Sequence, residues 1–139
     1  MAILIIDDES SLRRSLGAYL EDANYEILEA ENGLMGLEVL RENIDAVEAV
    51  LVDLNMPVMD GEELIRRVRE RKAVAELPII VVSTEGSFTR IAVLRKQGAG
   101  FVHKPFSPES LRQAVIELTG VTDDDQSAVG VGQGSGPDF

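Results

Sequence analysis

The chain has no cysteine and only one histidine, His103, among its 139 residues. A disulfide framework and a thiolate metal site are therefore excluded, and one histidine cannot build a histidine metal cluster. Basic residues are also few, 13 against 25 acidic ones, which gives a formal net charge of -12. Binding to a nucleic-acid backbone needs clustered lysine and arginine, so we expect no nucleic-acid partner. Any metal ion must be bound through oxygen.

Long apolar runs and a basic leader are missing as well. The first apolar run, residues 2–6, has only the length of a strand, and no lysine or arginine precedes it. We therefore expect a cytoplasmic protein with no signal peptide and no membrane insertion. From Val121 on, the chain is rich in aspartate and glycine and poor in large apolar groups. We predict one domain over residues 1–120 and an acidic, glycine-rich, disordered tail over residues 121–139.

Short apolar runs alternate with amphipathic segments five times within the predicted domain. This alternation is typical of βα units that wind into a parallel sheet with helices on both faces. We therefore predict a five-stranded α/β domain. The expected strands are residues 2–6, 25–29, 49–52, 77–82 and 101–103.

The expected helices are marked by apolar residues at helical spacing. The second helix is marked by Leu34, Leu37, Leu40 and Ile44. Asp60 with Glu63 resembles a capping box at the start of the third helix. The basic run from Arg66 to Lys72 in that region is interpreted as a solvated face, with binding to an acidic partner as the alternative. Ser107 before a proline is expected to begin the last helix, and Gly120 to end it.

Polar side chains stand where the apolar runs end. Asp7 and Asp8 follow the first run, Asp53 follows the third, and Thr84 comes shortly after the fourth. The carboxyl ends of parallel strands lie along one edge of an open sheet, where ligands bind. We therefore expect these four side chains in one pocket, with Asp53 displayed rather than buried.

Three carboxylates at one edge repel one another, and each would have a raised pKa unless a cation lay among them. Oxygen ligands with room for water suit Mg²⁺, which prefers one or two carboxylates together with phosphate oxygens. Lys104 follows the fifth run and would bring a positive charge to the same edge. This set of groups suits phosphoryl transfer, with Asp53 as the nucleophile, Mg²⁺ and Lys104 as balancing cations, and the Thr84 hydroxyl as a hydrogen-bond donor.

Four motifs follow one another in the chain: Asp7-Asp8, Asp53 within Asp-Leu-Asn-Met-Pro-Val-Met-Asp-Gly, Thr84, and Lys104-Pro105-Phe106. In this order they resemble the motifs of response-regulator receiver domains, and the chain looks like a single-domain, CheY-like receiver. The resemblance covers residues 1 to about 120. It implies a flavodoxin-like, doubly wound fold of five βα units, with a parallel five-stranded sheet in the order 2-1-3-4-5.

The resemblance also implies the chemistry of the pocket. Asp53 would accept a phosphoryl group from a phosphohistidine of a histidine kinase or of a histidine phosphotransfer protein. Asp8 and the backbone carbonyl of Asn55 would ligate Mg²⁺ together with Asp53, and Asp7 would help directly or through water. The chain would then be no enzyme, with only autophosphorylation and autodephosphorylation of its own.

A conformational switch is the second implication of the resemblance. Thr84 and Phe101 would couple phosphorylation to the face formed by the fourth helix, fifth strand and fifth helix, where a downstream protein would bind around Ile91, Arg95, Phe101 and Arg112. The peptide bond between Lys104 and Pro105 would be cis.

Two alternatives and two departures from the family pattern accompany this interpretation. The domain could serve as an intermediate receiver of a phosphorelay, or as a Mg²⁺-dependent aspartyl-phosphate phosphatase, although haloacid-dehalogenase-type phosphatases have an acid where this chain has Asn55.

The segment Gly98-Ala99-Gly100-Phe101 is one residue shorter than is usual in the family, which would tighten or shift the end of the fourth helix. Gly86 leaves no side chain above the phosphoryl group, which would alter the lifetime of that group.

Overall fold

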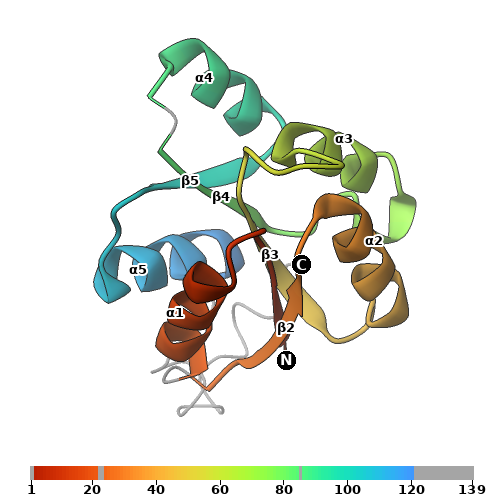
Figure 1. The fold of residues 1–139 in the computed structure, drawn as a ribbon. Coiled ribbons are helices and arrows are strands. Elements are labelled where there is room, and N and C mark those ends of the chain that lie inside the picture. Colours follow the sequence, from red (N-terminus) through yellow and green to blue (C-terminus); the bar gives the residue numbers. More distant parts are fainter. Residues whose placement is uncertain (1, 22–23, 85, 121–139) are drawn as a thin grey trace.

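The computed structural model describes residues 2–21, 24–84 and 86–120, so the expected tail lies outside the described residues. Within the described ranges, strands and helices alternate along the chain (Figure 1). The strands are β1 (Ala2–Ile6), β2 (Glu26–Ala30), β3 (Val47–Val52), β4 (Ile79–Ser83) and β5 (Ala99–His103). The helices are α1 (Ser10–Glu21), α2 (Gly33–Glu42), α3 (Gly61–Arg69), α4 (Phe88–Lys96) and α5 (Pro108–Thr119), with a short 3₁₀ helix, η1 (Lys72–Val74), after α3.

The strands form one parallel sheet in the order β2-β1-β3-β4-β5. This order confirms the flavodoxin-like α/β fold. All five residues of β1 and of β4 are buried, because strands covered on both faces need nearly continuous apolar sequence. The strand order reverses between β1 and β3, and this reversal opens a crevice outside the carboxyl ends of these two strands.

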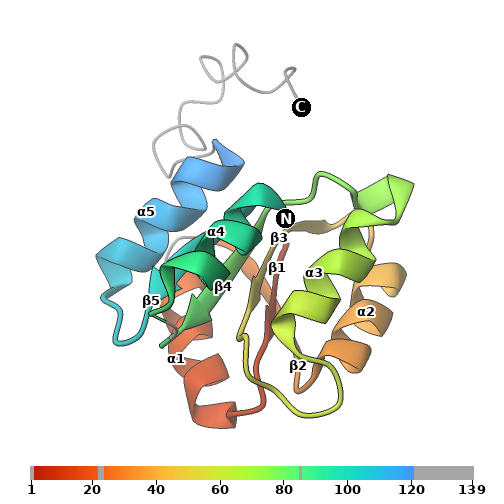
Figure 2. The same cartoon turned by 90° about the horizontal axis from the view of Figure 1, so that it is seen from above.

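Helices cover both faces of the sheet (Figure 2). One face carries α1 and α5, which bury leucines such as Leu16 and Leu111 against it. The other face carries α2, α3 and α4, to which α3 contributes Leu64, Ile65 and Val68. Burial of each such side chain contributes about 1.5–3 kcal/mol. Among the described residues, the structure contains no helix with the length and apolarity needed to cross a membrane.

The helix ends agree largely with the caps expected from sequence. The Ser107 hydroxyl accepts a hydrogen bond from the Ser110 N–H at 3.0 Å, and Gly120 ends α5 in the left-handed conformation at φ 73°. Asp60 accepts from the Glu63 N–H at 2.9 Å, but the Glu63 carboxylate pairs with an arginine of the next turn. Only half of the predicted capping box therefore forms at the start of α3.

The basic run from Arg66 to Lys72 is not entirely a solvated face, and this part of the interpretation is wrong. Arg69 is half-buried, and its guanidinium donates to the carbonyl oxygens of Gln97 at 2.7 Å and Leu77 at 2.7 Å. A further bond of 3.2 Å reaches the Ala75 carbonyl. Burial lowers the pKa of Arg69. Arg69 thus joins the end of α3 to the segments that lead into β4 and β5.

Candidate functional site

Three carboxylates meet outside the carboxyl ends of β1 and β3. Asp7 and Asp8 directly follow β1, Asp53 directly follows β3, and one oxygen from each lies within 4.8 Å of the others. Backbone hydrogen bonds hold the two segments in place, since the Asp53 N–H donates to the Ile6 carbonyl at 3.1 Å and the Asp7 N–H donates to the Ala30 carbonyl at 3.1 Å. The parallel pairing of β1 with its neighbours therefore continues up to the carboxylates.

Two carboxylates of the pocket are more buried than their positions at the ends of strands predict. Asp7 is 1% exposed and Asp53 is 8% exposed, while Asp8 is open to solvent. The prediction that Asp53 is displayed rather than buried is therefore wrong. The loop after β3 folds back, with the Gly61 N–H bonded to the Leu54 carbonyl at 2.9 Å, and a Cβ at Gly61 would come within 2.6 Å of the Asp53 carbonyl oxygen. The chain thus returns close to the backbone of Asp53.

Burial is the main influence on the ionisation of Asp7. Burial, with smaller contributions from the neighbouring Asp53 and Asp8, raises the pKa of Asp7 from its ordinary value of 3.8 to a net value of about 6. A hydrogen bond of 2.9 Å from the Glu9 N–H and the charge of Lys104 act in the opposite direction. The metal-free pocket thus holds more negative charge than its surroundings stabilise.

Lys104 supplies the positive charge of the pocket, as the strand-end pattern predicts. Its Nζ lies 3.4 Å from Asp53 Oδ2 and 3.8 Å from Asp7 Oδ2. Its backbone N–H donates to the Ser83 carbonyl at 2.9 Å, which ties the residue after β5 to the end of β4. The next peptide bond, to Pro105, is cis. Beyond the proline, the Phe106 ring meets the Tyr19 ring of α1 edge-on, with 6.1 Å between the ring centroids.

The two residues expected to form the switch lie on neighbouring strands. Thr84 follows β4 and is exposed, and its hydroxyl makes no hydrogen bond within the part of the chain that the structure describes. Phe101 lies in β5 opposite Val81 of β4 and is partly buried against the core. Its ring lies 4.7 Å from that of His103, between centroids. The structure therefore places Thr84 at the same edge of the sheet as the carboxylates.

Arg13 is a residue of this region that the sequence reasoning missed. Its guanidinium donates to the Asp7 backbone carbonyl at 2.6 Å and to Glu29 Oε1 at 2.9 Å. Arg13 therefore braces the turn between β1 and α1, where the two acidic residues lie. The apolar spacing of α1 gave no hint of this role, because it describes only the face that packs on the sheet.

The donor set suits a hard divalent cation. Carboxylate oxygens of Asp7, Asp8 and Asp53 converge, and the exposed Asp8 leaves one side open to water, as Mg²⁺ coordination requires. Asn55 lies beside this set, since its N–H donates to Asp53 Oδ1 at 3.4 Å. A cation here would stabilise the charged form of Asp7, whose pKa is raised by burial and by its carboxylate neighbours.

The geometry agrees with comparisons against known proteins. The family model of the response regulator receiver domain matches residues 3–116. The chain belongs to this family. Like other receiver domains, it is a module of two-component signalling with an acidic pocket at the carboxyl ends of its strands.

Relatives of this receiver domain occur both alone and within longer proteins. It is 35% identical to a chemotaxis protein CheY homolog of Campylobacter jejuni, over 86% of this chain and 93% of the relative. It is 40% identical to the transcriptional regulatory protein ResD of Bacillus subtilis, over 84% of this chain and only 45% of that protein. The solved structure of chemotaxis protein CheY4 of Vibrio cholerae is similar with a TM-score of 0.78 and 32% identity, covering 85% of this chain and 98% of that one.

Proposed function

We propose that Asp53 is the phosphoacceptor of this receiver domain and that it takes its phosphoryl group from a phosphohistidine of a kinase or of a phosphotransfer protein. The observation that supports this most strongly is the position of the Asp53 carboxylate, 3.4 Å from the Lys104 ammonium and within 4.8 Å of two further carboxylates. In the transfer, the bond from phosphorus to the histidine nitrogen breaks and a bond to an Asp53 oxygen forms. The histidine nitrogen keeps the electron pair and takes up a proton.

Each neighbour of Asp53 has a separate part in this transfer. Asp7, Asp8 and the Asn55 carbonyl, together with Asp53, would hold Mg²⁺, which would supply positive charge for the phosphoryl oxygens. Lys104 attracts the same oxygens from the side of β5. Thr84 moves inward and donates a hydrogen bond from its hydroxyl to one of these oxygens. The protein does not turn over an outside substrate, because Asn55 stands where a phosphatase of this type would have its second acid. The protein works in the cytoplasm, as a terminal regulator or as a relay intermediate.

Phosphorylation by acetyl phosphate tests this assignment. Wild-type protein should acquire a hydroxylamine-sensitive label that requires Mg²⁺, and Asp53→Asn should acquire none. Asp60→Asn is a matched control, because it makes the same change in the same loop and asparagine caps helices as well as aspartate does. Persistent label in Asp53→Asn, or label independent of Mg²⁺, would place the acceptor elsewhere.

The proposed output is binding of a downstream protein to the face formed by α4, β5 and α5. Two hollows of about 330 and 380 Å³ lie along β5 and α5 on this face, and both are lined by Phe101, Ala114 and Glu117. Inward movement of Thr84 would empty space behind β4, which the Phe101 ring could fill. Full burial of this partly buried ring is worth about 1–3 kcal/mol, enough to shift two states by roughly tenfold or more.

Amide chemical shifts with and without beryllofluoride, a mimic of the phosphoryl group, test this coupling. We expect changes at Ile91, Arg95, Phe101 and Arg112 in the wild type and their loss in Thr84→Ala. Changes confined to the Asp53 pocket, or unchanged propagation in Thr84→Ala, would leave Phe101 as a packing residue only.

We also propose that residues 1–120 form the whole folded unit. The last described helix ends at Gly120 with a left-handed cap, a conformation that commonly ends a helix. Truncation after Gly120 should therefore change the thermal midpoint and the rate of phosphorylation little. A midpoint lowered by many degrees would show that the boundary is wrong.

A further inference from the structure

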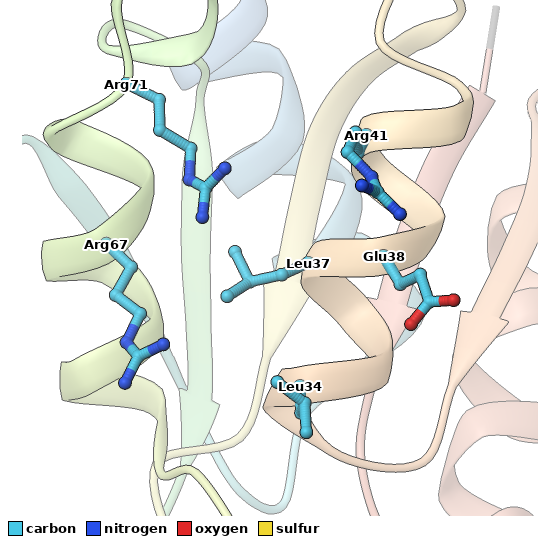
Figure 3. A pocket seen from close by; sticks show the side chains of 6 residues that line it. All are labelled: Leu34, Leu37, Glu38, Arg41, Arg67 and Arg71. Atoms are coloured by element: carbon cyan, nitrogen blue, oxygen red, sulfur yellow. The ribbon is translucent and has the colours of Figure 1, made fainter.

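A groove between α2 and α3 lies away from the carboxylate pocket. It consists of two adjoining hollows of about 190 and 270 Å³, which share Leu37, Arg41 and Arg71 among their lining residues. Figure 3 shows Leu37 pointing from α2 across the groove toward α3, with Arg67 and Arg71 on the opposite side. The floor of the groove is therefore apolar and its rim is basic.

The apolar floor exists because buried glycines let α2 pack closely on one side, which leaves part of its leucine stripe in the groove. Gly33 and Gly36 are buried, and a Cβ at Gly36 would overlap Ile6 Cδ1 of β1. Of the residues that mark this helix in the sequence, only Leu40 is buried, whereas Leu34 is 52% exposed and Ile44, just beyond the helix, is 39% exposed. The stripe that predicted the helix thus faces the groove. From Leu34 to Ile44 it spans about 15 Å, or roughly three helical turns.

The basic rim carries charge that the fold does not use. Arg41, Arg71 and Lys72 are exposed, and within the described residues none of their side chains has a hydrogen bond or an ion pair. Arg67 pairs only with Glu63 of its own helix, in an exposed contact. The one acidic side chain of the lining, Glu38, points away from Arg67 and Arg71 (Figure 3). This local excess of positive charge contrasts with a net charge of -12 for the chain.

We propose that the α2–α3 groove binds an acidic amphipathic helix of a partner protein. Such a helix places apolar side chains at i, i+3 or i+4, and i+7 onto the leucine floor, and its flanking carboxylates meet the free arginines. A polyanion such as nucleic acid fits less well, since it would leave the leucines without an apolar partner and would be repelled by the rest of the chain. This surface shares no residue with the face formed by α4, β5 and α5, so the two sites can be occupied separately.

Binding of a designed probe tests the proposal. The probe is a fluorescein-labelled helical peptide of about 14 residues with one leucine stripe flanked by glutamates, long enough to cover the groove. Two control peptides keep its composition with the stripe scrambled, or keep the stripe with lysine in place of glutamate. Fluorescence anisotropy with the full chain should give saturable binding of the probe and of neither control.

Two pairs of protein variants separate the groove from general electrostatics. Arg41→Glu with Arg71→Glu should weaken binding about tenfold or more, whereas Arg14→Glu with Lys96→Glu, an equal charge change at exposed positions outside the groove, should alter it within about twofold. Leu34→Ser should weaken binding, and Val93→Ser, at a similarly exposed apolar position of α4, should not. Thermal melts establish that each variant is folded.

Several results would overturn the proposal. Absence of saturable binding would do so, as would equal weakening by the two charge-reversed pairs or equal affinity for the scrambled peptide. Competition by a single-stranded oligonucleotide at concentrations similar to those of the unlabelled peptide would identify a polyanion site instead. In the supporting outcome, amide shifts on adding the peptide map to Leu34, Leu37 and Arg71 and leave β5 unchanged.

Discussion

Two clusters of like charge lie in different settings in this protein: the carboxylates of Asp7, Asp8 and Asp53 at the edge of the sheet, and the guanidinium groups of Arg41 and Arg71 beside α2 and α3. The carboxylates are carried by short side chains, and backbone hydrogen bonds at the strand ends hold them in place. Two of the three are almost completely buried. The guanidinium groups are carried by long, exposed side chains, and water and salt screen them from one another.

The contrast indicates that burial, more than the sign or number of charges, decides whether such a cluster costs stability. Where water is excluded, a like-charged neighbour disfavours the charged form. Where side chains are solvated, the same number of charges has little effect on folding and remains available for a partner. The following predictions test this contrast, from the largest expected effect to the smallest.

Arg69 belongs to the same basic run as the exposed Arg67 but is half-buried, so the two residues show the effect of burial within one run. Arg69→Met keeps an apolar stem and leaves the carbonyls of Gln97, Ala75 and Leu77 without their donor. We expect the free energy of unfolding in urea to fall by about 2–4 kcal/mol. Arg67→Met, which removes one exposed ion pair, should cost no more than about 0.5 kcal/mol. Equal losses in the two variants would contradict the contrast.

Asp7 should give the metal-free protein an unusual dependence on pH. Its pKa is about 6 in the folded protein against 3.8 ordinarily, so between these values the folded state holds a proton that the unfolded state has released. The contribution of Asp7 to the free energy of unfolding therefore falls as pH rises through about 4 to 6. Asp7→Asn should remove this dependence and stabilise the metal-free protein at pH 7 by about 1–3 kcal/mol.

Urea melts from pH 4 to pH 7 measure this effect, with Asp60→Asn as the control for the same chemical change at an exposed site. Saturating Mg²⁺ should make the wild type more stable than Asp7→Asn at pH 7, because the ion stabilises the wild type and loses a ligand in the variant. If the free energy of unfolding depended on pH in the same way in the wild type and in Asp7→Asn, Asp7 would not be the cause of that dependence.

Asp8 is the exposed member of the acidic cluster, so its removal should affect stability less. Asp8→Ala should raise the free energy of unfolding of the metal-free protein by no more than about 1 kcal/mol, through reduced repulsion. It should weaken Mg²⁺ binding about tenfold or more, because a ligand is lost. Calorimetry measures the binding, and a lower melting temperature of the metal-free variant would contradict the expectation.

The smallest effect is expected in the groove. Arg41→Glu with Arg71→Glu should change the free energy of unfolding by no more than about 0.5 kcal/mol, since neither side chain has a partner within the described residues. Thermal and urea melts beside the wild type measure the difference. A loss of several kcal/mol would show that these arginines hold α2 and α3 together and are not free.

The sequence allowed the fold and the membership of the pocket to be predicted, because both follow from where apolar runs end. Asp7, Asp8, Asp53 and Lys104 needed only the rule that carboxyl ends of parallel strands share an edge. The burial of Asp53 could not be predicted in this way, since the rule places a residue at the edge of the sheet and does not say how closely the surrounding loops pack on it.

Helical periodicity predicted α2 but not the direction in which its leucines face. An apolar stripe is compatible with packing on a sheet or with lining a groove. Gly36, which lies against Ile6 of β1, and Gly33, which lies against Met59, allow the other side of the helix to pack inward. Helical periodicity also did not predict the hydrogen bonds of Arg69. The path of a long side chain depends on the carbonyls it finds in space, and those of Gln97 and Leu77 come from distant parts of the chain.

The edge-on contact between Tyr19 and Phe106 makes intrinsic tyrosine fluorescence a probe of this protein. The chain contains no tryptophan and two tyrosines, so its ultraviolet fluorescence comes from Tyr19 and Tyr25 alone. Phe106 stands two residues after Lys104, and a shift of that segment changes the surroundings of the Tyr19 ring. In Tyr25→Phe, Tyr19 would be the sole tyrosine, and its emission should report shifts of the segment from Lys104 to Phe106 in real time without any attached dye.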